Sequence, residues 1–288
     1  MYPLLEEFID FKRSLGLKEK TISEYIDAVS KFLDFYCEHA NKSHLVKQSY
    51  KTITTLDMQT YSFKLRETKS VATTRKYQAS VSEFFRFLKA QNYISVNPLI
   101  GVQMQKDVIR TEREYMKVDE AIKMVEAVDN NYEKLMISLM FYQGYRIEEV
   151  TNIEVKNIDL ENNTITALRK HGKLQNLKVL KEVREMLVER VEYCNKNGHE
   201  FLFKSPKGNY GITSNSLRTV FNKWNTRLGF NEYYSPHDLR RACASLLHFE
   251  KGLPLLKVSK FMNHSNVNIT MLYLKISMES LNNELDDL

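Results

Sequence analysis

The amino-acid sequence predicts a mainly α-helical protein of two domains, the second of which includes a small antiparallel sheet. Apolar residues recur at helical spacing through most of the 288-residue chain, and hydrophobic residues make up 43% of it. This is enough for one large core or two modest ones. Residues 158–166 do not show helical spacing. Two short apolar runs flank Glu161-Asn162-Asn163 there, which is typical of a strand, a turn and a strand.

The first hundred residues predict a helical domain. Amphipathic patterns indicate four helices, at 3–14, 18–38, about 55–67 and about 73–92. The polar stretch 39–51 is expected to be a loop, and Asn97-Pro98 closes the unit. We therefore place a first domain at 1–102.

Residues 103–113 are polar and charged, and we interpret them as an interdomain linker. A second domain is expected at 114–274. Its predicted helices lie at about 119–128, 131–142, 181–195, 214–228, 237–251 and 255–262, and its strands at 158–160, 164–166 and about 177–180. The remaining residues, 275–288, form a short tail.

The charge balance leans towards a nucleic-acid partner. The net charge is +6 and the pI is about 8.9, which falls short of a strongly basic footprint. The fourth helix carries four basic residues that suit either contact with DNA or a solvated face: Arg75, Lys76, Arg86 and Lys89. The tail is acidic, so we do not expect it to lie on a phosphate backbone.

Cysteine usage and hydropathy point to a soluble protein of a reducing compartment. The three cysteines show no CxxC spacing, so neither a zinc site nor a disulfide framework is expected. The first residues lack the basic and apolar regions of a signal peptide, and no apolar run is long enough to span a membrane. We expect a cytoplasmic, nucleoid-associated protein without a cofactor or metal.

A group of residues spread through the second domain has the functional groups that phosphodiester chemistry requires. Arginine can bond two phosphate oxygens at once, histidine and lysine can donate or accept protons, and a tyrosine phenol can attack phosphorus. Each residue alone is ordinary, and most Arg-x-x-Glu pairs are surface ion pairs. The set is Arg146, Lys173, His237, Arg240, His264 and Tyr273.

The order and spacing of these residues resemble those of tyrosine recombinases of the phage integrase family, including Xer-type members. The family's first box corresponds to Gln143-Gly144-Tyr145-Arg146-Ile147-Glu148-Glu149-Val150. Its His-x-x-Arg box corresponds to His237–Arg240. Its final box, with a tyrosine nine residues after a histidine, corresponds to His264–Tyr273. The lysine of the family's β-hairpin falls on Lys173, and the resemblance covers nearly the whole chain.

The resemblance implies a site that holds the scissile phosphate from several sides. By this likeness, Arg146 and Arg240 clamp the phosphate and His264 donates a further hydrogen bond to it. It also implies the fold of the family, with a four-helix SAM-like core-binding domain and an α+β catalytic domain.

The likeness also implies how the bond is cut. Tyr273 attacks and leaves a 3′-phosphotyrosine, and Lys173 protonates the leaving 5′ oxygen. His237 serves as the general base or positions the tyrosine. Glu149 orients its neighbours, or is a purely structural partner.

Several positions depart from the family's usual pattern. Asn263 stands where glycine usually precedes the histidine, Tyr145 where leucine is common, and Arg241 where many members have histidine. The loop after Lys173 is poor in glycine and in basic residues, so Lys170 is an alternative for the hairpin lysine. None of these changes removes a group that the chemistry requires.

The function implied is site-specific recombination of double-stranded DNA with inverted-repeat half-sites, by a homotetramer on synapsed DNA. The work would be integration, excision or resolution of DNA, as in Xer systems or compact mobile elements, with accessory proteins as possible partners and no membrane. Two alternatives stay open: a type IB-like topoisomerase or telomere resolvase with the same site, and a catalytically silent DNA-binding regulator.

The tail continues an amphipathic pattern after Tyr273. Its apolar residues are Leu274, Ile276, Met278, Leu281 and Leu285. A helix this short is marginal alone and must bury its apolar side. It packs either on its own domain or, as in relatives of this family, on a neighbouring protomer.

Overall fold

The computed structural model describes residues 2–39, 47–100, 102, 114–168, 174–264 and 266–274. They form two compact units, Met1–Glu112 and Arg113–Leu288. The mainly helical class with one small antiparallel sheet, expected from the sequence, is confirmed. Within the described residues, no helix is both long and apolar enough to cross a membrane.

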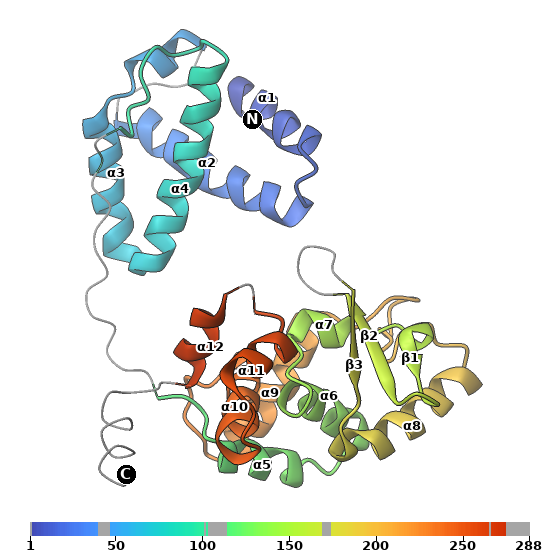
Figure 1. Cartoon of the computed structure of the whole chain (residues 1–288). Helices are drawn as coiled ribbons and strands as arrows, with labels where there is room; N and C mark the ends of the chain where they lie inside the picture. Colours follow the sequence, from blue (N-terminus) through green and yellow to red (C-terminus); the bar gives the residue numbers. More distant parts are fainter. Residues whose placement is uncertain are drawn as a thin grey trace, which may run out of the picture. The chain divides into compact units, whose positions relative to one another are not determined.

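The first unit is a helical bundle with an aromatic core. Its helices are α1 (Pro3–Ser14), α2 (Glu19–His39), α3 (Thr55–Thr68) and α4 (Val71–Ala90), with a 3-10 turn, η1, at Lys47–Thr52. Helices α1, α2 and α4 pack together (Figure 1). The apolar stripes meet at Phe8, Phe32 and Phe84, which are fully buried. Residues 40–46 of the expected loop lie outside the described part of the chain.

Side-chain caps fix where two of these helices begin. Thr54 Oγ1 accepts from the Asp57 backbone N–H at 3.3 Å, and Asp57 Oδ2 accepts from the Thr54 backbone N–H at 2.8 Å. This reciprocal pair is a capping box, which satisfies two backbone donors that the helix leaves without partners. Ser70 caps α4 through the Thr73 backbone N–H at 3.3 Å.

The second unit is built around α6. Its first helices are α5 (Val118–Ala127), α6 (Asn131–Phe141) and the short α7 (Ile147–Thr151), followed by a 3-10 turn, η2, at Val155–Asn157. Later in the chain come α8 (Lys181–Lys196), α9 (Ser214–Arg227), α10 (Pro236–Ser245), the π-helical turn η4 (Leu246–Glu250), α11 (Leu255–Phe261) and α12 (Val267–Leu274). Every α6 residue from Leu135 to Phe141 is buried. Helix α6 packs against α10 on one side and α8 on another.

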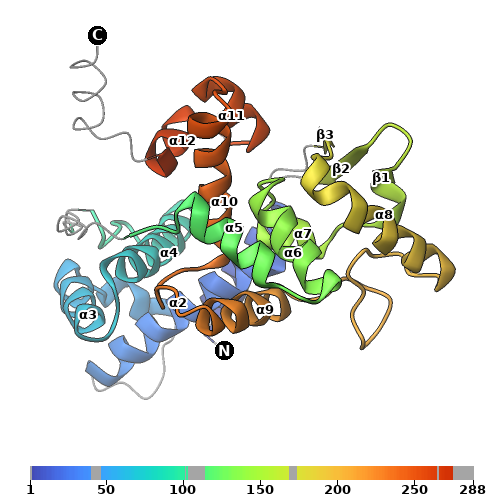
Figure 2. The ribbon, with the colours of Figure 1, turned by 90° about the horizontal axis from the view of Figure 1, so that it is seen from below.

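The sheet of this unit has three antiparallel strands in the order β1-β2-β3. The strands are β1 (Ile158–Asp159), β2 (Thr164–Leu168) and β3 (Leu174–Lys178), and Ile165 pairs with Leu177. Figures 1 and 2 show the sheet at one side of the unit and α10–α12 at the other, with α6 between them. The predicted third strand at about 177–180 is wrong in position, because pairing with β2 begins at Leu174 and ends at Lys178.

Candidate active site

The candidate site begins with the start of α10, which the sequence specifies locally. Ser235 is the N-cap residue of this helix. Its backbone N–H and its hydroxyl both donate to Asp238 Oδ2 at 2.7 Å, which holds the first turn in place. Pro236 follows at the first helical position, where its missing N–H has no consequence. His237 and Arg240 are then three positions apart and lie on one face of the helix.

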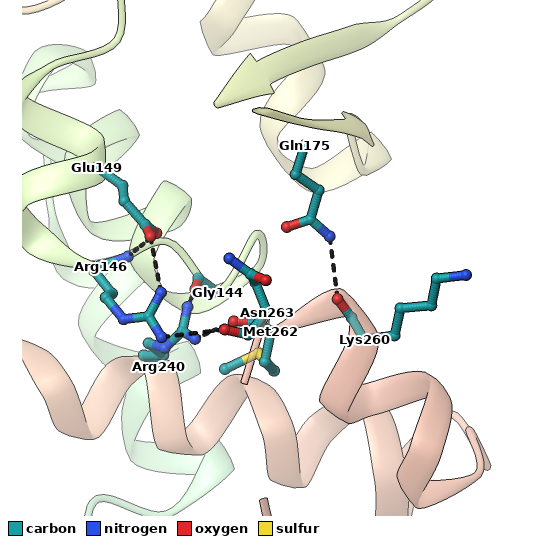
Figure 3. A network of polar contacts seen from close by, with 8 residues as sticks. All are labelled: Gly144, Arg146, Glu149, Gln175, Arg240, Lys260, Met262 and Asn263. Atoms are coloured by element: carbon teal, nitrogen blue, oxygen red, sulfur yellow. Dashed lines mark hydrogen bonds and ion pairs between the residues drawn. The ribbon is translucent and has the colours of Figure 1, made fainter. Parts of the chain in front are cut away.

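Arg240 is a fully buried guanidinium held by main-chain carbonyls. It is 0% exposed, and its two terminal nitrogens donate to the carbonyls of Gly144 and Met262 (Figure 3). Gly144 has φ +61, and a Cβ there would come within 2.7 Å of Met262 Sδ. A side chain at position 144 would therefore be strained by this φ and would push the Met262 side chain aside. A fork fixed in this way is oriented before any ligand arrives.

Arg146 reaches the same place from the start of α7. Its Nη1 lies 2.9 Å from Glu149 Oε1, and its backbone N–H donates to Glu149 Oε2 at 2.8 Å. Its Nη2 donates to the Asn263 carbonyl at 3.4 Å (Figure 3). The Glu149 side chain is only 7% exposed. Glu149 thus both caps α7 and sets the direction of the Arg146 side chain.

The end of α11 brings the two arginines together. Asn263 N–H donates to the Lys260 carbonyl at 3.1 Å and His264 N–H to the Ser259 carbonyl at 3.1 Å, which is the Schellman arrangement. The next two carbonyls, of Met262 and Asn263, accept from Arg240 and Arg146. A helix C-terminus carries partial negative charge, so it suits two guanidiniums.

Asn263 departs from the family's glycine for a reason that this turn explains. Its φ is +49, a left-handed conformation that asparagine tolerates better than other non-glycine residues. We expect Asn263→Gly to change the free energy of unfolding by less than about 0.5 kcal/mol, and Asn263→Val to lower it by about 1–3 kcal/mol. Urea denaturation of both variants tests this, and a valine variant as stable as the wild type would contradict it.

The remaining departures also have places in the structure. Tyr145 is a core residue, 1% exposed. The Arg241 guanidinium stacks on the Tyr115 ring at 3.9 Å and so ties α10 to the start of the second unit. Stacking of this kind is available to arginine through its planar group.

Both histidines of the set are near the arginines. The pKa of His237 is lowered to about 4 by desolvation and by the charges of Arg240 and Arg241. The pKa of His264 is lowered to about 3 by desolvation and by the charges of Arg240, Arg146 and His237. Both rings are therefore neutral near pH 7, so His237 can accept a proton and His264 can still donate one N–H.

These pKa values predict how stability depends on pH. In the unfolded chain a histidine has a pKa of about 6.5, so between pH about 6.5 and about 4 the unfolded state binds more protons. The free energy of unfolding should be greatest above pH 6.5 and fall as the pH is lowered. The His237 side chain keeps contact with solvent, which weakens both its desolvation and the effect of the neighbouring charges. The half-buried His264 should therefore give the larger share.

Urea denaturation at pH 7 and pH 5 measures this effect. We expect a lower midpoint at pH 5 for the wild type and a smaller difference for the variant with both histidines replaced by glutamine. An equal or higher wild-type midpoint at pH 5 would contradict the assignment of lowered pKa values.

The other predicted site residues are described only in part. Tyr273 lies in α12, which packs on α10 and α11, and its backbone alone is described. Lys173 and the alternative Lys170 lie outside the described residues, as do 275–288 of the tail. Near the start of β3, Gln175 Nε2 donates to the Lys260 carbonyl at 3.1 Å, which ties β3 to α11 (Figure 3). Across the described residues, no three His, Cys, Asp or Glu side chains gather as metal ligands would.

Sequence reasoning missed the main-chain groups and two side chains of this site. The carbonyls of Gly144, Met262 and Asn263 carry no side-chain signal, although the departure at Asn263 marked the turn. Nothing in the sequence was a reason to choose Gln175 or Thr270. Gln175 contacts Lys260, which is distant in sequence, and Thr270 contacts His264 from a separate helix.

The four basic residues of the first unit share α4 but differ in their contacts. Lys76 lies 2.9 Å from Glu24 of α2, and Arg86 pairs with Glu83 of its own helix. Lys76, Arg86 and Lys89 are exposed and Arg75 is half-buried. Exposed pairs contribute little to stability, so the carboxylates hold the Lys76 and Arg86 side chains only weakly.

Comparison with known proteins agrees with this site. The model of the phage integrase family matches residues 114–280. A tyrosine recombinase of Pseudothermotoga lettingae is 26% identical, with 96% of this chain and 94% of the relative covered. Tyrosine recombinase XerC of Herpetosiphon aurantiacus is 23% identical, with 96% and 92% covered.

Solved structures show the same fold. A lambda integrase fragment, crystallised as a dimer bound to a core site, superimposes with a TM-score of 0.76 over 94% of both chains at 16% identity. XerA recombinase gives a TM-score of 0.54 over 99% of this chain and 97% of that one at 19% identity. The family match spans more than half of the chain and coincides with the unit that holds the arginines and histidines. This chain belongs to the phage integrase family of tyrosine recombinases.

Proposed function

We propose that this recombinase cuts and rejoins DNA at specific sites through a covalent 3′-phosphotyrosyl bond to Tyr273. The observation that carries the proposal is the convergence of Arg146, Arg240 and the turn before His264 at the C-terminus of α11. These groups offer fixed positive charge and N–H donors to the anionic oxygens of a phosphodiester. Donors aimed at developing charge in this way are worth about 2.7–4 kcal/mol each in enzymes where one has been removed.

In the proposed step the Tyr273 oxygen forms a bond to phosphorus and the bond from phosphorus to the 5′ oxygen breaks. The phenol proton passes to His237, which is neutral and able to accept it. The leaving 5′ oxygen takes a proton from Lys173. Because the phosphate ester to tyrosine keeps the energy of the broken bond, a 5′ hydroxyl can reverse the step and rejoin a strand.

We also propose that the basic residues of α4 contact the DNA backbone: Arg75, Lys76, Arg86 and Lys89. Several solved relatives are complexes with DNA, including a lambda integrase tetramer bound to a Holliday junction. By analogy, two copies of this chain would bind inverted half-sites and four would form the synapse. Accessory proteins and association with the nucleoid belong to the same proposal.

Sequencing of product junctions tests the function. Plasmids with random inserts are incubated with the protein, and recombined junctions are sequenced to find the site. A nicked substrate that contains this site should then trap a covalent adduct. An intact substrate with the same site should yield exchanged strands. Relaxed plasmid without exchange would indicate a topoisomerase, hairpin ends a telomere resolvase, and binding without an adduct a silent regulator. The relatives compared above are named recombinases, which favours exchange.

Deletion of 275–288 tests the proposed trans packing of the tail. We expect the truncated protein to bind a single half-site within about threefold of the wild-type Kd, because the acidic tail has no role on the phosphate backbone. Synapsis should fall by at least about tenfold, the equivalent of 1.4 kcal/mol of lost contact. Gel shifts of one-site and two-site complexes measure both, and unchanged recombination would overturn the trans packing.

A further inference from the structure

A buried threonine contacts the histidine of the site from the helix that carries Tyr273. His264 Nδ1 lies 2.7 Å from Thr270 Oγ1. Thr270 is 0% exposed and belongs to α12, about one turn before Tyr273. His264 instead follows α11, in the turn whose carbonyls hold the arginines. The contact therefore joins two separate parts of the site.

The contact decides which nitrogen of His264 carries the proton. A neutral imidazole has one N–H, so one ring nitrogen donates and the other accepts. If the Thr270 hydroxyl donates to Nδ1, the proton is on Nε2. If Nδ1–H donates to the hydroxyl, Nε2 presents a lone pair.

Only one of these two forms can bind a phosphate. The non-bridging oxygens of a phosphodiester accept hydrogen bonds and repel a lone pair. His264 is neutral near pH 7 because it is desolvated and lies near two guanidiniums. Its use as a phosphate ligand therefore requires the Nε2–H form and a donor on the Nδ1 side, as partners of metal-bound histidines fix the tautomer in metal sites.

We propose that Thr270 is a positioning residue: its hydroxyl donates to Nδ1 of His264 and holds the ring in the Nε2–H form that binds the scissile phosphate. This inference rests on the proposed function. Helix α12 packs on α10 and α11, so Thr270 reaches His264 only while α12 is seated. Seating of the helix that carries Tyr273 then prepares His264 at the same time, and the phosphate is held best when the nucleophile is in place.

The test compares Thr270→Val, which keeps the shape and removes the hydroxyl, with Thr270→Ser, which keeps the hydroxyl. Single-turnover cleavage of a nicked substrate should fall about 10- to 100-fold in the valine variant, the range for the loss of an outer partner of a histidine ligand. Serine should stay within about threefold of the wild type. Affinity for uncut DNA should change by less than about threefold in both. Thr270→Ala serves as a second hydroxyl-free variant if valine prevents folding, and Thr219→Val, on the exposed face of α9, is the matched control.

Nitrogen-15 NMR of imidazole-labelled protein provides a readout that packing alone would not change. His264 should show the Nε2–H form in the wild type and the serine variant, and a mixture or the Nδ1–H form in the valine variant. Wild-type cleavage by Thr270→Val, equal loss in serine and valine, or an unchanged tautomer would each overturn the inference. If the wild type itself forms no adduct, the proposed function fails instead.

Discussion

Replacement of Tyr273 by phenylalanine is expected to abolish the covalent adduct and all strand cleavage. The substitution removes one oxygen, which in the proposed step is the atom that bonds to phosphorus. In the proposed arrangement the phosphate is held between fixed donors, and no second nucleophile lies beside it. We therefore do not expect water to replace the Tyr273 oxygen. A nicked substrate incubated with each protein and resolved on a denaturing gel measures the adduct directly.

The controls for Tyr273→Phe concern folding and binding. The midpoint of thermal unfolding and the affinity for uncut DNA should match the wild type, because the ring is kept. Tyr234→Phe is a matched control, since its hydroxyl donates to Glu120 at 2.9 Å and takes no part in the proposed step. An adduct that persists in Tyr273→Phe would show that another residue attacks.

Replacement of Arg240 should have the second largest effect. Arg240→Lys keeps a positive charge but cannot bond the carbonyls of Gly144 and Met262 and a phosphate oxygen with one planar fork. We expect cleavage to fall by about 10²–10³-fold, as when one fixed donor is lost from an enzyme site. Arg240→Ala should lose at least as much, and its cavity should also lower stability by about 2–5 kcal/mol. Single-turnover cleavage and urea denaturation separate these two effects.

A surface arginine supplies the comparison for Arg240. Arg227 is more than half exposed near Asp129, and Arg227→Lys should cleave at the wild-type rate. Cleavage by Arg240→Lys within threefold of the wild type would contradict the clamp. If Arg240→Lys weakened DNA binding but left the cleavage rate of bound DNA unchanged, Arg240 would act in binding the uncut substrate and not in the cleavage step.

Local sequence signals predicted much of the fold. Helices with apolar stripes, such as α1 and α2, were predicted to within about a residue, because spacing alone defines their buried face. The box of Ser235, Pro236 and Asp238 fixes the start of α10 within four residues. The predicted helix at 237–251 continues past Ser245 as a π-helical turn, which no local pattern indicates.

The errors also have physical causes. Helix α7 was not predicted, because its five residues are too few to show a helical repeat. Its start depends on the cap from Glu149. The start of β3 was placed too late because the polar pair Gln175-Asn176 interrupts the apolar pattern and asparagine has low strand propensity. Pairing with β2 outweighs that propensity.

The site was predicted as residues but not as an arrangement. Spacing and likeness to the family gave the arginines, histidines and tyrosine. The bonds that orient them run from Arg240 to Gly144, from Arg146 to Asn263 and from His264 to Thr270. Two of these use main-chain carbonyls that every residue has, so their partners emerge only when the chain is folded.

Mapping the wild-type adduct tests directly whether Tyr273 is the nucleophile. A nicked substrate with the sequenced site is incubated with the protein, and the trapped complex is digested with protease and nuclease and analysed by mass spectrometry. We expect one modified peptide, with a nucleotide joined through its 3′ phosphate to Tyr273, and a free 5′ hydroxyl on the other DNA product. A link to any other residue, or a 5′ phosphate joined to the protein, would contradict this expectation.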